Sequence, residues 1–404
     1  MNLDAWREVA EGWWRHRFRT AVTAGSVAWG VLLLVVLLAA GTGLENSLRW
    51  EYRDDAINSI WIFGGQTTKP FKGQNTGRRI VYDNDDYGWV RAQGWSGATT
   101  GRYYPPGDTT MRWKGRVGSY DIRAVHPGHR DVEQSIVTDG RFLNDRDIEE
   151  RRKVVVIGER VRDFLFEDAD PLGEVMVIGD AAWTVVGVFT DVGGARETQL
   201  VYLPVTTAQA VFGAGEDLVM LMFTVDSETT AEASADIERA AVEGLASRHV
   251  VDPKDKGAIR VRNNLERFAD VQRIFGWLRG FTWLVGLGTV AAGAVGVGNI
   301  MLISVQERTR ELGLRKALGA TPRQLVQMIV AESVALTAVS GYLGLVAGVL
   351  IVELFPENES LRDPSVDLGA ALVATGVLVL TGVLAGWFPA RRAARIPATE
   401  ALRA

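Results

Sequence analysis

The 404-residue sequence contains no cysteine, and this absence limits its chemistry. Without thiols the chain forms no disulfide, binds no metal through thiolate and uses no cysteine nucleophile. Histidine is also scarce, with four copies. The lack of cysteine does not place the protein in a compartment, because thiol-free chains occur on both sides of a membrane.

Several nucleotide-binding and catalytic motifs are also missing. The sequence has no GxxxxGK[ST], so it does not predict a phosphate-binding loop of that kind. It has no GxSxG or HExxH, which removes two routes to a hydrolase. The formal net charge of −5 argues against a general nucleic-acid-binding protein. These absences remove those particular routes and argue against nucleic acid as a partner, and other features of the sequence must indicate the function.

Long hydrophobic runs are the main feature that is present. The mean hydropathy of +0.05 is ordinary, but the apolar residues are concentrated in four runs. A bilayer core of about 30 Å needs roughly 20 helical residues. Three runs are uncharged and one carries Glu332 near its start; they are 21–44, 281–306, 325–352 and 368–390. The first is longer than the core of a signal peptide, so we interpret it as an uncleaved span.

The charges between these runs predict the orientation. Lys and Arg prevail before the first span, between the second and third, and after the fourth. The positive-inside rule then places both termini and the 307–324 loop in the cytoplasm. The predicted fold is an integral membrane α-helical protein of four transmembrane helices, with a large α+β extracytoplasmic domain between helices 1 and 2. Its segments are a cytoplasmic start (1–20), helix 1 (21–44), the extracytoplasmic domain (45–270), helix 2 (275–305), a cytoplasmic helix (306–322), helix 3 (323–352), a short outer loop (353–366), helix 4 (367–389) and a cytoplasmic tail (390–404).

Small residues recur in the spans at helical spacing. Gly344 and Gly348 form a GxxxG in the third span, and Gly382 and Gly386 form another in the fourth. Because small faces let helices approach closely, these pairs predict a helix bundle or a dimer. The glycine-rich string 293–298 lies inside a membrane run with no preceding strand, so a dinucleotide site there is rejected.

The segment between the first two spans predicts mixed α and β structure. Apolar, β-branched runs indicate strands at 153–158, 175–178, 183–189, 201–203, 218–225 and 258–262, with a hairpin turn at Gly179-Asp180. Residues 229–248 have helical spacing. A second helix is expected from about Asn264 into the second span, as a stalk above the membrane. Between 64 and 120 we expect loops and short strands.

Three candidate sites in the sequence are weak. His126 and His129, near Asp131 and Glu133, could hold zinc; the intervening Pro-Gly favours a surface turn. The run of Asp83, Asp85 and Asp86 resembles the start of a calcium loop, but Gly94 stands where the last ligand should be. Glu332 is either an intramembrane functional carboxylate or, as we favour, an interfacial residue.

The loop between the second and third spans is the most informative segment. It changes from an apolar helix into a short amphipathic one, in which Leu312, Leu314 and Leu318 alternate with charged residues. Gly319 can end that helix. Thr321 can cap the next one, with Pro322 at its first position. Physical reasoning alone leaves two interpretations open, a helix rigidly joined to two spans or a solvated basic loop.

Here the sequence resembles the permease family of ABC transporters typified by the macrolide exporter MacB and by FtsX. Residues 299–320 match that family's NIM–ERTREIG–R–A–GA pattern. Further matches are His16–Thr20 before the first span, the strand–loop–hairpin 154–188 and the ending from Gly386 through Arg403. The topology of four spans with a large domain after the first is also similar. The chain departs from the macrolide exporter in lacking a fused nucleotide-binding domain, and its 64–120 region matches no part of the family pattern.

The resemblance implies a permease in the bacterial inner membrane, working as a homo- or heterodimer with a separate ABC ATPase that binds ATP and Mg²⁺. This chain itself would then be non-catalytic and would bind no cofactor, metal or nucleic acid. It implies a two-lobed periplasmic core domain, with the second lobe at roughly 136–215. A coupling helix would contact the ATPase, and its expected site residues are Glu307, Arg308, Thr309, Arg310, Glu311, Gly313, Arg315, Lys316 and Gly319. The expected tail residues are Arg391, Arg392 and Glu400.

The function implied is mechanotransmission, in which ATP hydrolysis drives a conformational change outside the membrane. We expect this to export a drug, peptide or lipid-linked cargo, with a periplasmic adaptor and an outer-membrane channel as further partners. Two alternatives stay open: an FtsX-like regulator that activates a cell-wall hydrolase, and a lipoprotein-release permease.

Overall fold

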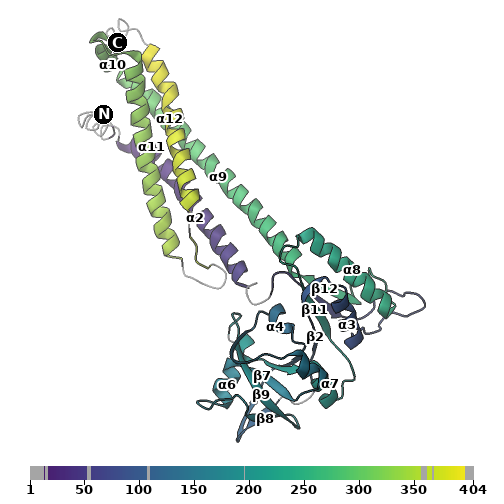
Figure 1. The fold of residues 1–404 in the computed structure, drawn as a ribbon. Coiled ribbons are helices and arrows are strands. Elements are labelled where there is room, and N and C mark those ends of the chain that lie inside the picture. Colours follow the sequence, from purple (N-terminus) through teal and green to yellow (C-terminus); the bar gives the residue numbers. More distant parts are fainter. Residues whose placement is uncertain are drawn as a thin grey trace. The chain divides into compact units, whose positions relative to one another are not determined.

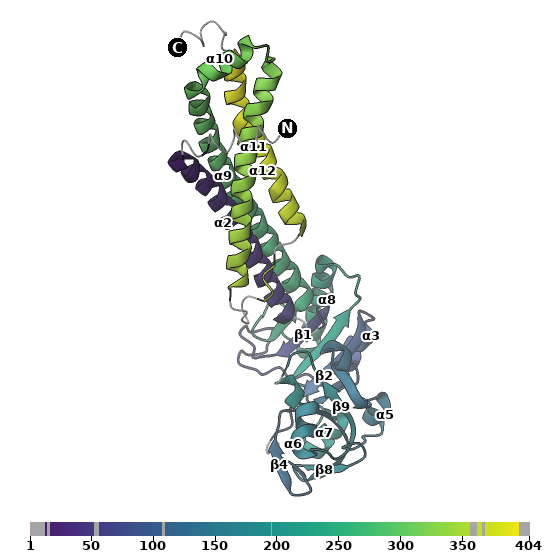
Figure 2. The same ribbon diagram turned by 90° about the vertical axis from the view of Figure 1, so that its left-hand side faces the viewer.

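The computed structural model describes residues 13, 17–51, 56–106, 110–194, 196–355, 362–365 and 368–395. The chain divides into two compact units. One combines Met1–Leu48 with Arg273–Ala404 and is called the membrane unit below. The other, Arg49–Gln272, is called the inserted domain. Figures 1 and 2 show the elements of each unit from two directions.

Within the described residues, four helices are long and apolar enough to cross a bilayer, as the four hydrophobic runs predicted. They are α2 (Arg17–Glu51), α9 (Asn264–Glu307), α11 (Pro322–Glu353) and α12 (Leu368–Arg395). The expected helix from Asn264 into the second span is confirmed, because α9 is continuous over 44 residues. The start of α11 is also as predicted: the Thr321 side chain accepts a hydrogen bond from the Gln324 amide, and Pro322 takes the first position.

These helices pack through one apolar cluster. Val27, Val31 and Val35 recur every four residues, which places them on one face of α2. They meet side chains from the other three helices, namely Val290, Val297, Met301, Leu336 and Leu378. Large apolar residues on the outer faces, such as Leu284 and Leu350, are exposed, as expected of helices that meet lipid.

The inserted domain is built on one twelve-stranded mixed sheet. The strand order is β12-β1-β11-β2-β5-β10-β7-β9-β8-β3-β4, and β6 pairs with β9. Most neighbours are antiparallel, whereas β10 with β5 and β7 with β9 are parallel. The strands are β1 (Ser59–Gly64), β2 (Ser96–Tyr103), β3 (Thr110–Trp113), β4 (Arg116–Ser119), β5 (Ile122–Val125), β6 (Ile136–Gly140), β7 (Val154–Gly158), β8 (Val175–Ile178), β9 (Ala181–Thr190), β10 (Val201–Pro204), β11 (Met220–Val225) and β12 (Ile259–Asn263).

Short helices and one long helix accompany the sheet. They are α3 (Asn84–Ala92), α4 (His129–Val132), α5 (Asp145–Glu149), α6 (Glu159–Leu165), the 3₁₀ turn η1 (Glu197–Gln199), α7 (Val205–Phe212) and α8 (Ala231–His249). One apolar cluster extends along most of the sheet and includes fully buried Trp183, Phe223 and Ile60. Each such side chain contributes roughly 1.5–3 kcal/mol on burial, so a continuous core holds the domain without disulfides.

The predicted elements of this domain are largely confirmed. β8 and β9 form the expected antiparallel hairpin, and Gly179 at its turn has a φ of +60°. The strands β7, β10, β11 and β12 and the helix α8 lie where their sequence patterns indicated. β3 and β4, which precede residue 136, join the same end of the sheet as β8.

The region from 64 to 120 is more regular than predicted. It contains the eight-residue strand β2 and the helix α3, besides the short strands β3 and β4. Asp83 is the N-cap of α3 and forms a capping box with Asp86. The aspartates that resemble a calcium loop therefore begin a helix.

Candidate functional site

A short helical connection between α9 and α11, here called the hook (residues 308–321), contains all but one of the residues predicted for the coupling helix. α9 ends at Glu307, and α10 (Thr309–Ala317) follows after a single residue, Arg308. Thr309 Oγ1 donates to the carbonyl of Gln306 at 2.7 Å. After α10, Gly319 has a φ of +99°, a conformation that favours glycine. The sequence therefore ends one helix and caps the next within five residues.

The inner face of the hook is apolar. Leu312 is buried against side chains from the ends of α9, α11 and α12. These side chains are Val305, Leu325, Ile329, Ala390 and Ala393. Gly313 beside it is also buried. The hook is thus packed onto α9, α11 and α12 rather than solvated on all sides, which favours the first of the two interpretations of this loop.

Polar contacts fix the hook further. Lys316 Nζ lies 3.1 Å from the Ala394 carbonyl near the end of α12. Arg308 Nη1 lies 3.5 Å from Glu332 Oε2 on α11. Glu332 is therefore buried and paired with a cation of the hook, a partner that the sequence analysis did not predict. A buried carboxylate with a cationic partner is far less costly than an isolated one.

The outer face of the hook carries two exposed leucines. Leu314 of α10 is 51% exposed, and Leu318, which caps the end of α10 four residues later, is 80% exposed. Charged side chains surround them: Arg310 is exposed, and Glu311 pairs with Arg315 at 2.9 Å. An apolar centre with a charged rim is typical of a protein-docking surface.

The residues predicted for the coupling helix divide between the exposed and the packed sides of this segment. Glu307, Arg310, Glu311 and Gly319 are exposed. Arg308 and Lys316 reach back to the helix ends, and Arg315 Nη1 lies 2.8 Å from Met328 Sδ. Leu314 and Leu318 were not among the predicted site residues; their i, i+4 spacing was the available signal.

The four glycines of the two GxxxG pairs each pack closely against another helix of the same chain. A methyl group at Gly344 would overlap the Ala28 carbonyl of α2, and one at Gly348 would crowd Val35. A methyl at Gly382 would overlap Thr337 Oγ1, and one at Gly386 would overlap Ser333 Oγ. These glycines therefore allow α2, α11 and α12 to pack closely in one bundle, one of the two roles their spacing predicted.

The predicted tail residues lie at and beyond the end of α12. Arg391 and Arg392 are exposed, and the Arg391 guanidinium lies 4.9 Å from the centre of the Trp387 ring. Glu400 lies outside the described residues.

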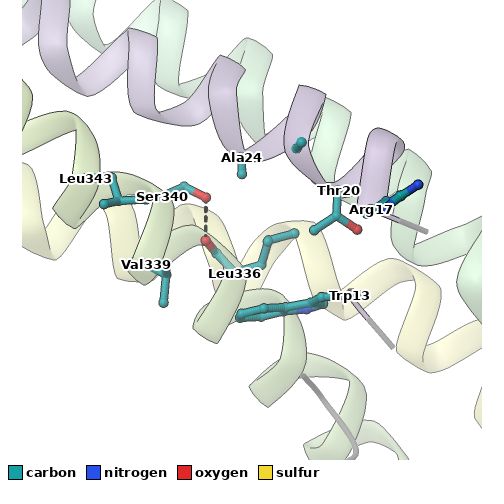
Figure 3. A pocket seen from close by; sticks show the side chains of 9 residues that line it. Trp13, Arg17, Thr20, Ala24, Leu336, Val339, Ser340 and Leu343 are labelled. Carbon is teal, nitrogen blue, oxygen red and sulfur yellow. Dashed lines mark hydrogen bonds between the residues drawn. The ribbon is translucent and has the colours of Figure 1, made fainter. Parts of the chain in front are cut away.

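A groove opens between α2 and α11 (Figure 3). Its volume is about 370 Å³. Its lining combines aliphatic and small residues with one cation, and consists of Trp13, Arg17, Thr20, Ala21, Ala24, Leu336, Val339, Ser340 and Leu343.

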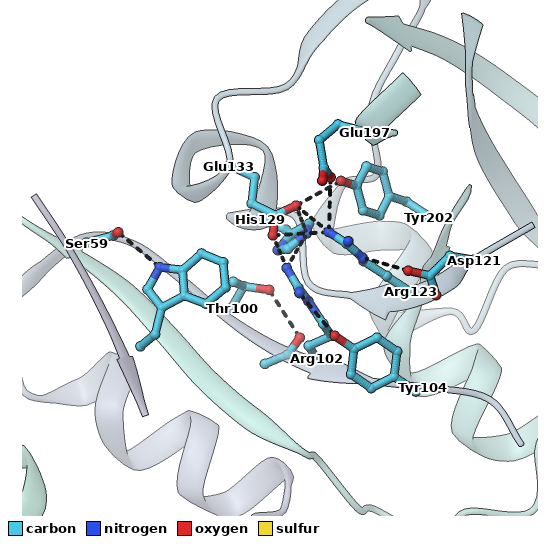
Figure 4. Close-up of polar contacts among 12 residues, drawn as sticks. Ser59, Thr100, Arg102, Tyr104, Asp121, Arg123, His129, Glu133, Glu197 and Tyr202 are labelled. Carbon is cyan, nitrogen blue, oxygen red and sulfur yellow. Dashed lines mark hydrogen bonds and ion pairs between the residues drawn. The ribbon is translucent and has the colours of Figure 1, made fainter. Parts of the chain in front are cut away.

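A buried polar cluster occupies the middle of the sheet in the inserted domain (Figure 4). Glu133 lies at its centre. Arg102 of β2 donates to Glu133 Oε1, Arg123 of β5 lies 3.1 Å from Oε2, and the Tyr202 hydroxyl of β10 donates to Oε2 at 2.9 Å. His129 Nε2 lies 3.1 Å from the same oxygen. The cluster joins β2, β5 and β10, which are consecutive neighbours in the sheet.

We predicted that His126 and His129 lie in a turn at the surface, and the predicted exposure is wrong. Pro127 and Gly128 do form a turn, but both histidines are buried. Burial lowers the pKa of His129 to about 4 and that of His126 to about 3, so both are neutral at pH 7. Burial alone would raise the pKa of Glu133, but Arg102, His129 and Arg123 together hold it well below its usual value. No local pattern in the sequence indicates that Arg102 and Arg123 lie beside Glu133.

The chain matches two known protein families, one over the inserted domain and one over the segment that contains the hook. Residues 20–240 match the MacB-like periplasmic core domain, and residues 283–398, which include the hook, match the FtsX-like permease C-terminal domain. The first match alone covers more than half of the chain. The chain belongs to the MacB/FtsX-like family of ABC transporter permeases.

Curated relatives of this permease agree over nearly its whole length. It is 28% identical over 399 residues to the macrolide export ATP-binding/permease protein MacB of Bdellovibrio bacteriovorus, covering 96% of this chain and 60% of the relative. It is 29% identical over 410 residues to the pyoverdine export ATP-binding/permease protein PvdT of Pseudomonas entomophila, covering 98% and 58%. The chain thus spans about three fifths of the length of these relatives.

Solved structures were compared as well. The periplasmic region of MacB from Actinobacillus actinomycetemcomitans covers 55% of this chain and 95% of its own, at 18% identity and a TM-score of 0.45. From the family models and the four apolar helices, this permease is an inner-membrane protein with an α+β domain between its first two spans.

Proposed function

We propose that this chain is the permease subunit of an ABC transporter that converts ATP hydrolysis by an ABC ATPase into movement of the inserted domain. The observation that carries the proposal is the hook, whose outer leucines are exposed while its inner face packs against three long helices. ATP and Mg²⁺ would be bound by the ATPase. The hook would then lie in the cytoplasm and the inserted domain on the other side of the membrane.

Force applied to the hook has a defined route. Leu312, Lys316 and Arg308 contact the ends of α9, α11 and α12, so displacement of α10 loads all three helices. Of these, α9 is a single helix of 44 residues, or about 66 Å at 1.5 Å per residue. Its first residue, Asn264, directly follows β12 of the inserted domain. We infer that α9 transmits the motion without a substrate path through the bundle.

Export is the favoured outcome of that motion. The inserted domain matches the MacB-like core domain, and the relatives above are named as exporters of macrolides and pyoverdine. We propose a drug, peptide or lipid-linked cargo, a dimer of permeases, and an adaptor with an outer-membrane channel as further partners. FtsX-like activation of a cell-wall hydrolase and lipoprotein release share the same hook, so the cargo must be tested separately.

The docking surface is tested by substitution on the full chain, copurified with its ABC ATPase. Leu314→Ala with Leu318→Ala should reduce ATPase association and stimulation by about tenfold or more, because buried interface anchors commonly contribute over 1 kcal/mol each. The matched control is Leu284→Ala with Leu350→Ala, which removes exposed leucines from the spans. Unchanged association in the hook variant, or equal loss in the control, contradicts the assignment.

A second variant addresses the charged rim. Glu311→Ala with Arg315→Ala should weaken the ATPase contact while leaving the membrane unit folded, because Glu311 is exposed and neither residue belongs to the buried apolar cluster around Leu312. Size-exclusion chromatography reports the fold, and copurification reports the contact. A folded variant that still binds and stimulates the ATPase normally would remove these residues from the proposed surface.

A further inference from the structure

The groove between α2 and α11 has no role in the proposed transport cycle. It lies between two helices that are long and apolar enough to span a membrane, so in a bilayer its aliphatic part would meet lipid hydrocarbon. Small residues Ala21, Ala24 and Ser340 leave the space, and Leu336, Val339 and Leu343 border it. In Figure 3, Thr20 and Ala24 on α2 face Ser340 and Leu336 on α11.

The interior of the groove demands no polar ligand. The Ser340 hydroxyl donates to the Leu336 carbonyl at 2.7 Å, so its own hydrogen bond is already made within α11. Thr20 is the other hydroxyl in the lining and stands toward the end that carries Arg17. An occupant that fills this space therefore gains most by being aliphatic over the Ala24–Leu343 part.

The end of the groove away from Leu343 carries a cation and an aromatic ring. Arg17 stands at the first residue of α2, four residues before the uncharged run begins, and it is exposed. It forms no ion pair with any residue that the structure describes, whereas Arg19 lies 3.6 Å from Glu307. Trp13 lines the same end. Tryptophan and arginine are the side chains expected at the level of lipid headgroups.

We propose that this groove is a binding site for an anionic phospholipid, with an acyl chain between α2 and α11 and the phosphate beside Arg17. Both parts of the lipid meet matching chemistry: the chain meets aliphatic walls, and the negative headgroup meets a cation that no described residue neutralises. A second copy of the chain is the competing occupant. A two-fold contact through this face would bring the Arg17 cations of the two copies toward each other, which opposes that alternative.

The test measures lipid retention by the full chain in detergent, with native mass spectrometry and phosphatidylglycerol or phosphatidylcholine as probes. The wild type should retain phosphatidylglycerol more tightly. Arg17→Gln should reduce that preference by about fivefold, since one cation near an anionic surface contributes about 1 kcal/mol. Arg17→Lys should restore most of it. Arg19→Gln, two residues further along α2 and already paired with Glu307, is the matched control and should change little.

A second variant fills the groove. Ala24→Leu should reduce retention of both lipids, whereas Ala291→Leu, at an exposed position of α9, should not. Equal retention of the two lipids by the wild type, or equal loss in Arg17→Gln and Arg19→Gln, overturns the proposal. If Ala24→Leu changes the oligomeric state but not lipid retention, the occupant is a second copy and the lipid site is wrong.

Discussion

Two histidines in the inserted domain show how burial changes a single residue. Because the pKa of His129 is about 4 and that of His126 about 3 in the folded chain, neither takes up a proton until well below the usual 6.5. The unfolded chain does bind those protons from about pH 6.5 downward. The stability that these two neutral histidines contribute is therefore fully present above pH 6.5, and it is lost as the pH falls toward their pKa values in the folded chain.

We predict that the free energy of unfolding falls on acidification by up to about 1.4 kcal/mol per pH unit for each histidine. Denaturant unfolding of the full chain in detergent, followed by tryptophan fluorescence between pH 7.5 and 5, measures the slope. His129→Gln should make it shallower, because one titrating group is gone. A slope that is the same in this variant would show that His129 does not carry the effect.

Gly386 and Gly376 on α12 form a second comparison at the scale of residues. A methyl group at Gly386 overlaps Ser333 Oγ, whereas nothing lies within 4 Å of one at Gly376. We predict that Gly386→Ala lowers stability by about 1–3 kcal/mol through overpacking. Gly376→Ala should be neutral or slightly stabilising, because alanine favours helices. Thermal unfolding in detergent distinguishes the two, and equal midpoints would contradict the packing shown here.

At the scale of elements, the hook separates stability from coupling on one short helix. Leu312 is 5% exposed and packs against α11 and α12, whereas Leu318 is 80% exposed. We predict that Leu312→Ala lowers the free energy of unfolding by about 2–5 kcal/mol. Leu318→Ala should leave unfolding unchanged and reduce ATPase stimulation. Denaturant titration and an ATPase assay measure the two effects, and the reverse assignment would mean that α10 faces the other way.

The elements themselves were largely predictable from sequence. The bilayer imposes span length and loop charge, and Gly319, Thr321 and Pro322 mark the hook boundaries directly. The orientation of α10 was not predictable. Its leucines at 312, 314 and 318 are equally apolar, and only packing against Leu325 and Ile329 selects Leu312 as the buried one.

The buried cluster around Glu133 shows the same limit for a site. Its partners Arg102, Arg123 and Tyr202 come from three strands far apart in sequence, so no local pattern joins them. His126-Pro-Gly-His129 taken alone therefore suggested a surface turn. In α3, the capping-box spacing of Asp83 and Asp86 was a local signal, but the calcium-loop resemblance obscured it.

At the scale of the whole molecule, the proposed orientation places the hook and the inserted domain on opposite sides of the membrane. The cysteine-free sequence makes this testable without background. We predict that Glu167→Cys, an exposed position of the inserted domain, reacts with an impermeant maleimide added outside intact spheroplasts. Thr321→Cys on the hook should react only after permeabilisation. Labelling of both from one side would contradict the topology.

The central claim is that the outer face of the hook receives an ABC ATPase, and crosslinking from Leu318 tests it most directly. A photoreactive phenylalanine analogue at 318 should crosslink in native membranes to a protein with nucleotide-binding motifs, identified by mass spectrometry. The same analogue at Leu284, a comparably exposed position in α9, should crosslink no such protein. The account predicts an ATPase adduct at 318 alone; an adduct at neither position, or equally at both, would contradict it.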